Sequence, residues 1–176
     1  MKNVPRKQQE DLRNNVQAHN RFEPMSKKKE EAIPVNALVG QWEPIILTMD
    51  SGAGNNVAPR NAFPWIALEP NDDSRAGKYY LAANGKRVYV LGEKVVTLRM
   101  PDGRIKKMRF QIADVTRVLV SIGKVTQAGN DVTMSAKGGK VVDKLGNEYN
   151  MELENGVYVM KCELEKATQR FLGQAQ

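Results

Sequence analysis

Residues 45–59 read IILTMDSGAGNNVAP, an apolar run that ends on an aspartate, after which the chain becomes polar and rich in glycine. A strand that ends on Asp50 partly buries the carboxylate, Gly52 allows backbone to approach it closely, and the Ser51 hydroxyl can donate a hydrogen bond that fixes the loop. The ordinary alternative is a turn aspartate, because Asp readily hydrogen-bonds to nearby backbone. The surrounding sequence has to decide between these two interpretations.

The chain beyond residue 38 has the pattern of an all-β domain. Short apolar or alternating runs recur roughly every eight to twelve residues with turn signals between them, a spacing typical of a sandwich or barrel. Pairs such as Asn84-Gly85 and Asn155-Gly156 tolerate the positive φ of tight hairpin turns. The predicted strands are residues 43–49, 78–82, 87–91, 94–100, 106–112, 117–122, 131–135, 140–143, 148–153 and 157–163.

The composition also predicts the domain organisation. Residues 1–37 are polar, charged and nearly free of β-branched side chains, so we expect a disordered or loosely helical leader. Residues 38–163 should form one domain, and residues 164–176 a short helical or disordered tail. Within the domain, residues 122–129 carry apolar side chains at every third position and end on glycine, which predicts one short helix.

The single histidine, His19, and the single cysteine, Cys162, exclude several chemistries. Within one chain they leave no disulfide, no Cys/His zinc site, no Ser-His-Asp triad and no Cys-His pair, so carboxylates remain as catalytic candidates. We therefore expect no metal and no cofactor, and we expect Cys162 to be a small packed side chain. The absence of a long apolar run and of a secretory signal predicts a soluble, cytoplasmic protein with no membrane partner.

The net charge of +7 is spread along the chain. Residues 1–32 carry eight basic and five acidic residues, and the run Lys27-Lys28-Lys29 is followed at once by Glu30-Glu31. Mixed runs of this kind are usually solvated, so nucleic acid is not the expected partner. A basic nucleic-acid-binding β-barrel stays an alternative, and it would require an aromatic stacking face and a concentrated basic groove.

Residues 49–53 read MDSGA with Val57 shortly after, and this pattern resembles the active-site loop of retroviral-type (retropepsin-like) aspartic proteases. Residues 82–99, AANGKRVYVLGEKVVTLR, resemble the flap of the copia-type retrotransposon proteases. Residues 112–129, IADVTRVLVSIGKVTQAG, resemble their second signature, in which an apolar strand pair runs into a short helix. Residues 154–161, ENGVYVMK, resemble the segment that follows the protease core in copia-like polyproteins.

The resemblance implies a retropepsin-like closed β-barrel (acid protease fold) with one short helix, which acts as a homodimer. Asp50 would face its counterpart across the two-fold axis, where two close carboxylates share one proton. One carboxylate would activate a water and the other would protonate the carbonyl oxygen of an extended peptide. Residues 39–42 and 157–162 would build the interface. The implied activity is that of an aspartic endopeptidase that processes a retrotransposon-type polyprotein.

The same resemblance assigns the site residues. Asp50, Ser51 and Gly52 would be catalytic, and Ser51 would hydrogen-bond across the dimer axis. The tip of the flap would lie at Asn84-Gly85 or at Leu91-Gly92. The substrate-binding and flap residues would be Ala53, Gly54, Asn84, Gly85, Val90, Leu91, Gly92, Leu119 and Val120.

A second function is open beside this one. Position 54 is glycine, where the retroviral enzymes carry an acidic or polar residue that helps to hold the substrate backbone. Lys86, Arg87, Glu93 and Lys94 also give the expected flap an unusual charge. The alternative is therefore a retropepsin-like module that is catalytically weak or inactive and serves in dimerisation or peptide binding.

Overall fold

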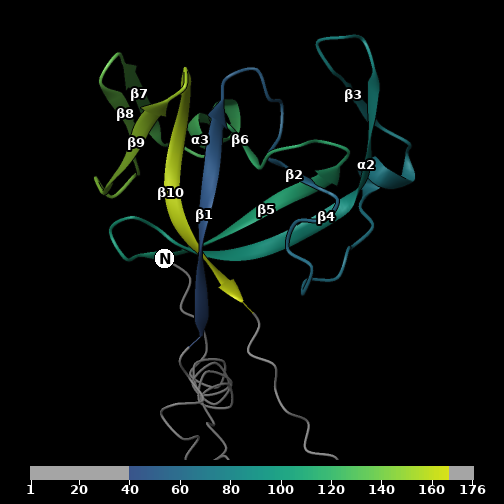
Figure 1. Cartoon of the computed structure of the whole chain (residues 1–176), viewed down its shortest axis with the longest axis horizontal. Helices are drawn as coiled ribbons and strands as arrows, with labels where there is room; N and C mark the ends of the chain where they lie inside the picture. The colour runs from purple at the N-terminus through teal and green to yellow at the C-terminus, as the bar shows by residue number, and fades with distance from the viewer. Residues whose placement is uncertain (1–39, 167–176) are drawn as a thin grey trace, which may run out of the picture. The chain divides into compact units, whose positions relative to one another are not determined.

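The computed structural model describes residues 40–166, so the predicted leader, residues 1–37, and residues 167–176 of the predicted tail lie outside the described part. Strands make up most of the described chain, which confirms the all-β prediction (Figure 1). The elements are β1 (Gln41–Asp50), β2 (Val57–Pro59), α2 (Asp72–Arg75), β3 (Tyr79–Leu81), β4 (Arg87–Arg99), β5 (Ile105–Ala113), β6 (Leu119–Ser121), α3 (Ile122–Gln127), β7 (Asp131–Ser135), β8 (Gly138–Val142), β9 (Glu148–Glu154) and β10 (Val157–Lys166).

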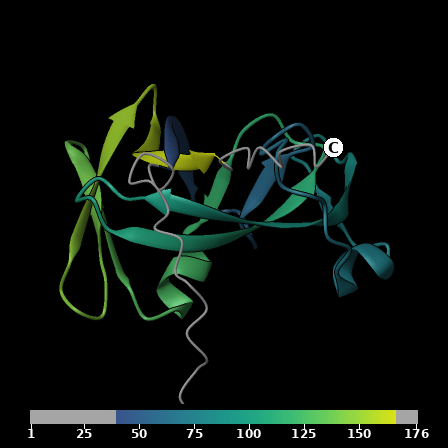
Figure 2. The same ribbon diagram turned by 90° about the horizontal axis from the view of Figure 1, so that it is seen from below.

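Six of the strands pair in a circuit. In the order β4, β5, β2, β6, β1 and β10, each strand is hydrogen-bonded to the next, and β10 returns to β4 through Glu163↔Arg99 and Leu164↔Leu98. β1 and β10 are antiparallel over nine residue pairs. β9, β8 and β7 continue the sheet beyond β10, and β3 pairs with the N-terminal part of β4. Figures 1 and 2 both show β7–β9 and α2 at opposite ends of this arrangement.

The main hydrophobic core receives side chains from all six strands of the circuit and from β8 and β9. Buried and more exposed positions alternate along β4, so Val96 and Leu98 are buried while Thr97 between them is not. Phe110 of β5 packs against Phe63, with 5.6 Å between the ring centroids. Apolar burial, worth about 25 cal/mol per Å² removed from water, is the main force that holds the circuit together.

Residues 87–91 and 94–100, predicted as two strands, form the single strand β4. The alternation continues across Gly92, where a β-bulge shifts the register against β5. Gly92 has φ 153°, and a Cβ at this position would lie 2.5 Å from the carbonyl oxygen of Glu69. The glycine therefore marks a bulge and a close approach of backbone. Leu91-Gly92 lies inside a strand and is not the tip of a hairpin.

The short elements differ in how well the sequence predicts them. The helix expected at residues 122–129 is confirmed as α3, with Ser121 as its N-cap and with Gly129 at φ 86° just after its C-cap. β2 and α2 were not predicted, because a strand of three residues and a helix of four are too short to show a period. α2 is instead specified locally by Asn71 and Ser74, whose side chains each accept a hydrogen bond from the other's backbone N–H.

The C-terminal boundary of the domain was predicted too early. Residues 164–166 were expected to begin a helical or disordered tail, but they are the last residues of β10. Leu164 is buried in the main core, and Glu163 and Leu164 form the pairing with β4 that completes the circuit. Because this contact is long-range, the local charged sequence gives no sign of it.

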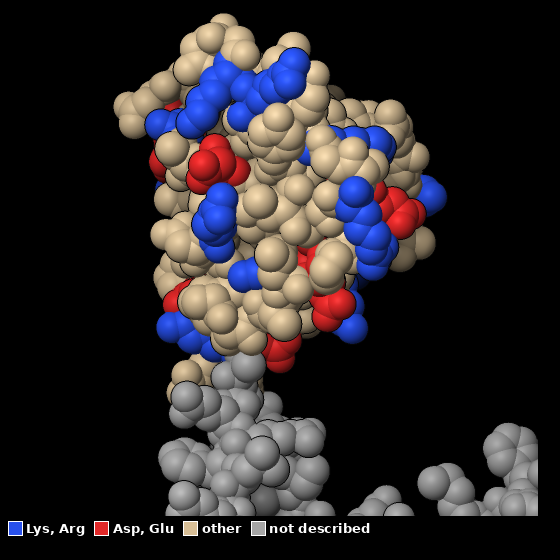
Figure 3. All heavy atoms as spheres, turned by 90° about the vertical axis from the view of Figure 1, so that its right-hand side faces the viewer, with Lys and Arg blue, Asp and Glu red and all other residues tan. Residues whose placement is uncertain are grey.

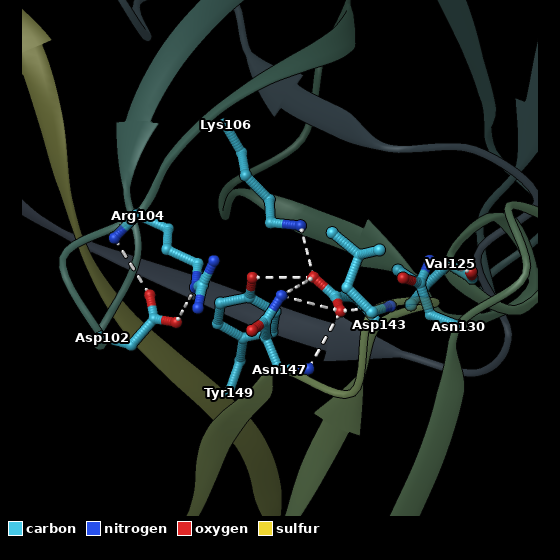
Figure 4. Close-up of polar contacts among 9 residues, drawn as sticks. Asp102, Arg104, Lys106, Val125, Asn130, Asp143, Asn147 and Tyr149 are labelled. Carbon is cyan, nitrogen blue, oxygen red and sulfur yellow. Dashed lines mark hydrogen bonds and ion pairs between the residues drawn. The ribbon is translucent and has the colours of Figure 1, made fainter.

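One carboxylate organises the turn between β8 and β9. Asp143 accepts hydrogen bonds from the backbone N–H groups of Leu145 (2.9 Å) and Asn147 (3.0 Å) and from the Tyr149 hydroxyl (3.0 Å). Lys106 of β5 forms an ion pair with it at 3.2 Å (Figure 4). These donors, with the Asn147 side-chain amide contributing most, hold the pKa of the Asp143 carboxyl well below its usual range. The turn is thereby fixed to β5.

Candidate active site

Asp50 is the last residue of β1, where the strand leaves the sheet. At this point β1 pairs in parallel with β6, with Asp50 opposite Ser121, and the backbone N–H of Thr48 donates to the carbonyl of Val118 at 3.0 Å. β6 in turn pairs with β2 on the other side of the loop. The preceding residue, Met49, is buried in the main core. Because β1 also pairs with β10 as far as Met49, the end of the strand lies between β10 and β6, and the sheet fixes the position of Asp50.

A groove of about 400 Å³ lies between the loop after β1 and the hairpin of β3 and β4. Apart from Asp50, no charged side chain of the described residues lines it, and its walls are mainly apolar. Most of its lining residues belong to two segments, the loop after β1 and the β3–β4 hairpin, which are separated in sequence and meet only in the fold. The lining residues are Asp50, Gly52, Ala53, Gly54, Val57, Tyr80, Leu81, Ala82, Ala83, Val88, Val115 and Leu119.

One oxygen of the Asp50 carboxylate has no protein partner within residues 40–166. Oδ1 accepts a hydrogen bond from the backbone N–H of Gly52 at 2.7 Å, and a Cβ at Gly52 would lie 3.3 Å from that oxygen. No hydrogen bond to Oδ2 and no ion pair to the carboxylate occurs in this part of the chain. Asp50 therefore shapes its own turn with one oxygen, while the other has no protein partner in the described chain, and the residue lines the groove. The two interpretations of the aspartate are compatible.

Two side chains that the sequence did not single out hold the loop in place. Ser121, which is only 1% exposed, donates from Oγ to the carbonyl of Ala53 at 2.5 Å, and its backbone N–H donates to Asn56 Oδ1 at 2.9 Å. Asn56 Nδ2 donates to the carbonyl of Arg109 on β5 at 3.2 Å. The loop is therefore tied to β6 and to β5 at once, and the only signal in the sequence is a small polar residue at the end of an apolar strand.

The hairpin of β3 and β4 turns at Asn84-Gly85. Gly85 has φ 78° and its N–H donates to the carbonyl of Ala82 at 2.8 Å, while the N–H of Lys86 donates to Asn84 Oδ1 at 3.0 Å. Asn and Gly suit this turn because both tolerate the positive φ that tight hairpin turns require. Of the two positions expected for the tip of the flap, Asn84-Gly85 is the one at which the chain turns.

The predicted site residues separate into two groups. Asp50 and four of the others line the groove, namely Gly52, Ala53, Gly54 and Leu119, while Ser51 is exposed in the same loop and Asn84 and Gly85 form the turn of the hairpin. Val90, Leu91, Gly92 and Val120 do not line it. Val120 belongs to the main hydrophobic core, on the face of β6 opposite to that of Leu119, and Val90 is buried.

A chain of hydrogen bonds connects the loop after β1 to the hairpin and to α2. Asn55 Nδ2 donates to the Tyr80 hydroxyl at 3.0 Å, and that hydroxyl donates to Gln111 Oε1. Gln111 Nε2 donates to Asp73 Oδ2 at 2.7 Å, and Lys78 Nζ pairs with Asp73 Oδ1 at 2.6 Å. Burial raises the pKa of Tyr80, and the bond from Lys78 lowers the pKa of Asp73. None of these five residues was predicted to belong to the site, because the hydrogen bonds of Tyr80 and Gln111 join residues that are distant in sequence.

The charges expected on the flap are mostly engaged elsewhere. Lys94 is buried, and its ammonium donates to the carbonyls of Ala62 (2.9 Å) and Phe63 (3.0 Å). Glu93 forms an ion pair with Arg109 at 2.8 Å. Figure 3 shows Lys and Arg side chains on this face of the molecule interspersed with Asp, Glu and uncharged surface. Several basic side chains lie together at the top of this view, and over the rest of the face the picture shows no basic stripe of the kind that a nucleic-acid groove requires.

Elsewhere in residues 40–166, a smaller cavity is mainly apolar and the single cysteine is packed. A second cavity, of about 110 Å³, lies among Met49, Met100, Met108 and Met160 and is mainly apolar. Burial raises the pKa of Cys162 to about 12, so this thiol is a packed, protonated side chain, as expected. In the described part of the chain, no three His, Cys, Asp or Glu side chains gather as metal ligands do.

No helix among the described residues is long and apolar enough to span a membrane. A scan against models of known protein families finds none that matches this chain, and a search of curated proteins finds no match either. The geometry of the site and the resemblance of its motifs therefore carry the assignment of a function.

Proposed function

We propose that this domain is a retropepsin-like aspartic endopeptidase that acts as a homodimer on a retrotransposon-type polyprotein. The observation that carries the proposal is the place of Asp50, which lines an otherwise uncharged groove and has one carboxylate oxygen without a protein partner in the described chain. The β3–β4 hairpin forms the opposite wall, as the flap of such an enzyme would. The circuit of six paired strands supports the closed-barrel form of the fold.

The chemistry requires a second carboxylate, which a second copy of the chain would supply. Two carboxylates about 3 Å apart cannot both ionise without a large cost, so the pair shares one proton. The ionised carboxylate takes a proton from a water as the water oxygen attacks the peptide carbonyl carbon, and the protonated one gives its proton to the carbonyl oxygen. The tetrahedral intermediate collapses when the carboxyl that took the water proton gives it to the amide nitrogen, the other carboxylate takes back a proton from a hydroxyl of the intermediate, and the C–N bond breaks to leave a carboxylic acid and an amine.

The groove suits an extended peptide with an apolar side chain beside the scissile bond. Val57, Val88 and Leu119 supply apolar wall on both sides of Asp50, and the small residues Ala53 and Gly54 leave room for the substrate backbone. An extended peptide gains main-chain hydrogen bonds as well as side-chain pockets. Closure of the hairpin over the peptide would exclude water and strengthen the electrostatic interactions at the carboxylates.

The first test compares the wild type with Asp50→Asn on a broad peptide library between pH 4 and 7. The substitution keeps the size of the side chain but removes the group that titrates, so we expect at least about a thousand-fold loss of cleavage and, for the wild type, a bell-shaped dependence of rate on pH. Asp131→Asn makes the same chemical change on β7, where the side chain is exposed and away from the groove. This control should keep full activity.

Mixing the two proteins tests the shared site directly. If each active dimer needs two Asp50 carboxylates, an excess of Asp50→Asn chains should inhibit the wild type by forming mixed dimers, and activity should also fall on dilution. Cleavage that is unaffected by the variant would contradict a shared pair. A wild type that is folded and dimeric but cleaves no peptide would favour the alternative, a dimerisation or peptide-binding module.

A further inference from the structure

We infer that Tyr80 is a positioning residue, whose hydroxyl ties the β3–β4 hairpin to the loop after β1 and thereby sets the width of the groove that contains Asp50. The tie itself follows from the contacts of Tyr80 with Asn55 and Gln111. Its consequence for peptide binding rests on the proposed function. No other polar side-chain contact among the described residues joins the hairpin to this loop.

The direction of the hydrogen bonds shows why a hydroxyl is needed at this point. Asn55 donates its amide N–H to the Tyr80 oxygen, so the hydroxyl proton is left to donate to Gln111 Oε1. Gln111 then donates its own amide N–H to Asp73. Each group accepts from one neighbour and donates to the next, an arrangement in which the bonds polarise and strengthen one another. A side chain at position 80 that can neither accept nor donate loses the hydrogen bonds to both Asn55 and Gln111.

This chain of hydrogen bonds ends at Asp73, a carboxylate whose pKa is lowered. Lys78 pairs with Asp73 at 2.6 Å and, together with Gln111, lowers the pKa of the Asp73 carboxyl. A lowered pKa means that Asp73 stays charged through the usual titration range of Asp, so that the bond to the charged form is lost only as the pH falls through the lower, folded-state value. The tie should therefore be intact between pH 4 and 7, where a pair of aspartates would act.

Besides this tie, the hairpin contacts the body of the domain through a small apolar cluster, in which Val88 packs with Val57 and Ala113. β3 pairs with β4 over three residues only, from Tyr79↔Tyr89 to Leu81↔Arg87, and an isolated two-stranded hairpin is marginally stable in water. The ring of Tyr80 lines the groove beside Val88, so the same residue forms the wall and anchors it. Loss of the hydroxyl alone should let the hairpin move away from Asn55 without changing the apolar surface of the wall.

The experiment measures hydrogen exchange of the backbone amides of residues 79–90 in four variants. Tyr80→Phe keeps the ring and removes the hydroxyl, and Asp73→Asn weakens the far end of the chain without touching the groove. Tyr79→Phe and Asp72→Asn are the matched controls, because Tyr79 has no hydroxyl partner among the described residues and Asp72 contacts only Arg75. We expect exchange in the hairpin to become about three- to ten-fold faster in the first two and unchanged in the controls.

Kinetics on the peptide found for the wild type then separate this inference from the proposed function. We expect Tyr80→Phe and Asp73→Asn to raise KM about three- to ten-fold with kcat within two-fold of wild type, and with the pH profile unshifted, because Asp50 is untouched. Faster exchange in a protein that cleaves nothing would support the tie and refute the peptidase. Wild-type exchange and KM in Tyr80→Phe, in an active enzyme, would overturn the tie. If Tyr80→Phe does not fold, hydrogen exchange and KM of Asp73→Asn test the tie in its place.

Discussion

Ser121 shows how a single buried hydroxyl can set the geometry of a site. Its Oγ donates to the carbonyl of Ala53 and accepts from the backbone N–H of Lys124, so it closes the loop after β1 and caps α3 at the same time. The residue is almost fully buried. A buried carbonyl that loses its donor bears the full cost of its desolvation, whereas an exposed one turns to water.

We expect Ser121→Ala to lower the free energy of unfolding by about 2 kcal/mol, because it removes a cap and leaves the Ala53 carbonyl without its side-chain donor. Ser135→Ala is a matched control, since Ser135 Oγ also donates to a carbonyl, that of Gly138, and accepts from an N–H, that of Lys137, but in an exposed turn. Its loss should be below about 0.5 kcal/mol. Urea unfolding of both variants checks this, and equal losses would show that burial is not the deciding factor.

At the residue scale, the sequence predicted the groups whose signal is local. Asp50, Gly52 and the Asn84-Gly85 turn were identified because the neighbours of each residue constrain it. Ser121 and Tyr80 were missed as functional residues, because a hydroxyl acquires its role from partners that are dozens of residues away. Side-chain hydrogen bonds between elements leave no periodic pattern in a single sequence.

The turn between β8 and β9 is an element whose stability depends on one charge. Asp143 accepts from Leu145, Asn147, Tyr149 and Lys106, and these contacts join the β7–β9 sheet to β5. A carboxyl whose pKa is lower in the folded than in the unfolded state contributes stability above its unfolded pKa, about 3.9 for Asp. That contribution disappears as the pH falls through the lower, folded-state value.

We therefore expect Asp143→Asn to lower the Tm clearly at pH 7, and the difference from wild type to shrink as the pH is lowered below about 4. Asp102→Asn is the control, because Asp102 lies in an exposed turn and the donors to its carboxylate among the described residues all belong to Arg104. Its Tm should stay close to that of wild type at every pH. Thermal unfolding followed by circular dichroism from pH 7 to pH 2.5 makes the comparison, and a constant difference across that range would contradict the charged role of Asp143.

Elements were predicted well where a period of two runs long enough. β1, β5, β7 and β9 match expected strands to within a residue or two, and α3 matches its apolar spacing. β4 was predicted as two strands, residues 87–91 and 94–100, whereas Gly92 between them marks a bulge inside one alternating pattern. β2 was missed because its three residues follow a polar, glycine-rich loop and pair with strands distant in sequence.

At the scale of the whole molecule, the circuit closes where β10 meets β4, at residues 163 and 164. Two interactions lie side by side at this closure. Glu163 forms an ion pair with Arg99 at 2.5 Å, but both side chains are more than a third exposed. Leu164 is buried in the main core. Exposed ion pairs typically contribute up to about 1 kcal/mol, whereas a buried leucine contributes several times as much.

The closure should accordingly depend on the apolar contact. We expect Leu164→Ala to lower the free energy of unfolding by about 3 kcal/mol and Glu163→Gln by less than about 1 kcal/mol, as measured by urea unfolding at pH 7. Raising the salt concentration to 1 M should leave the first loss unchanged and reduce the second, because salt screens only the ion pair. If Glu163→Gln were the more damaging change, the charged pair would hold the circuit. Its closure would then weaken with ionic strength, which a domain held mainly by its apolar core does not do.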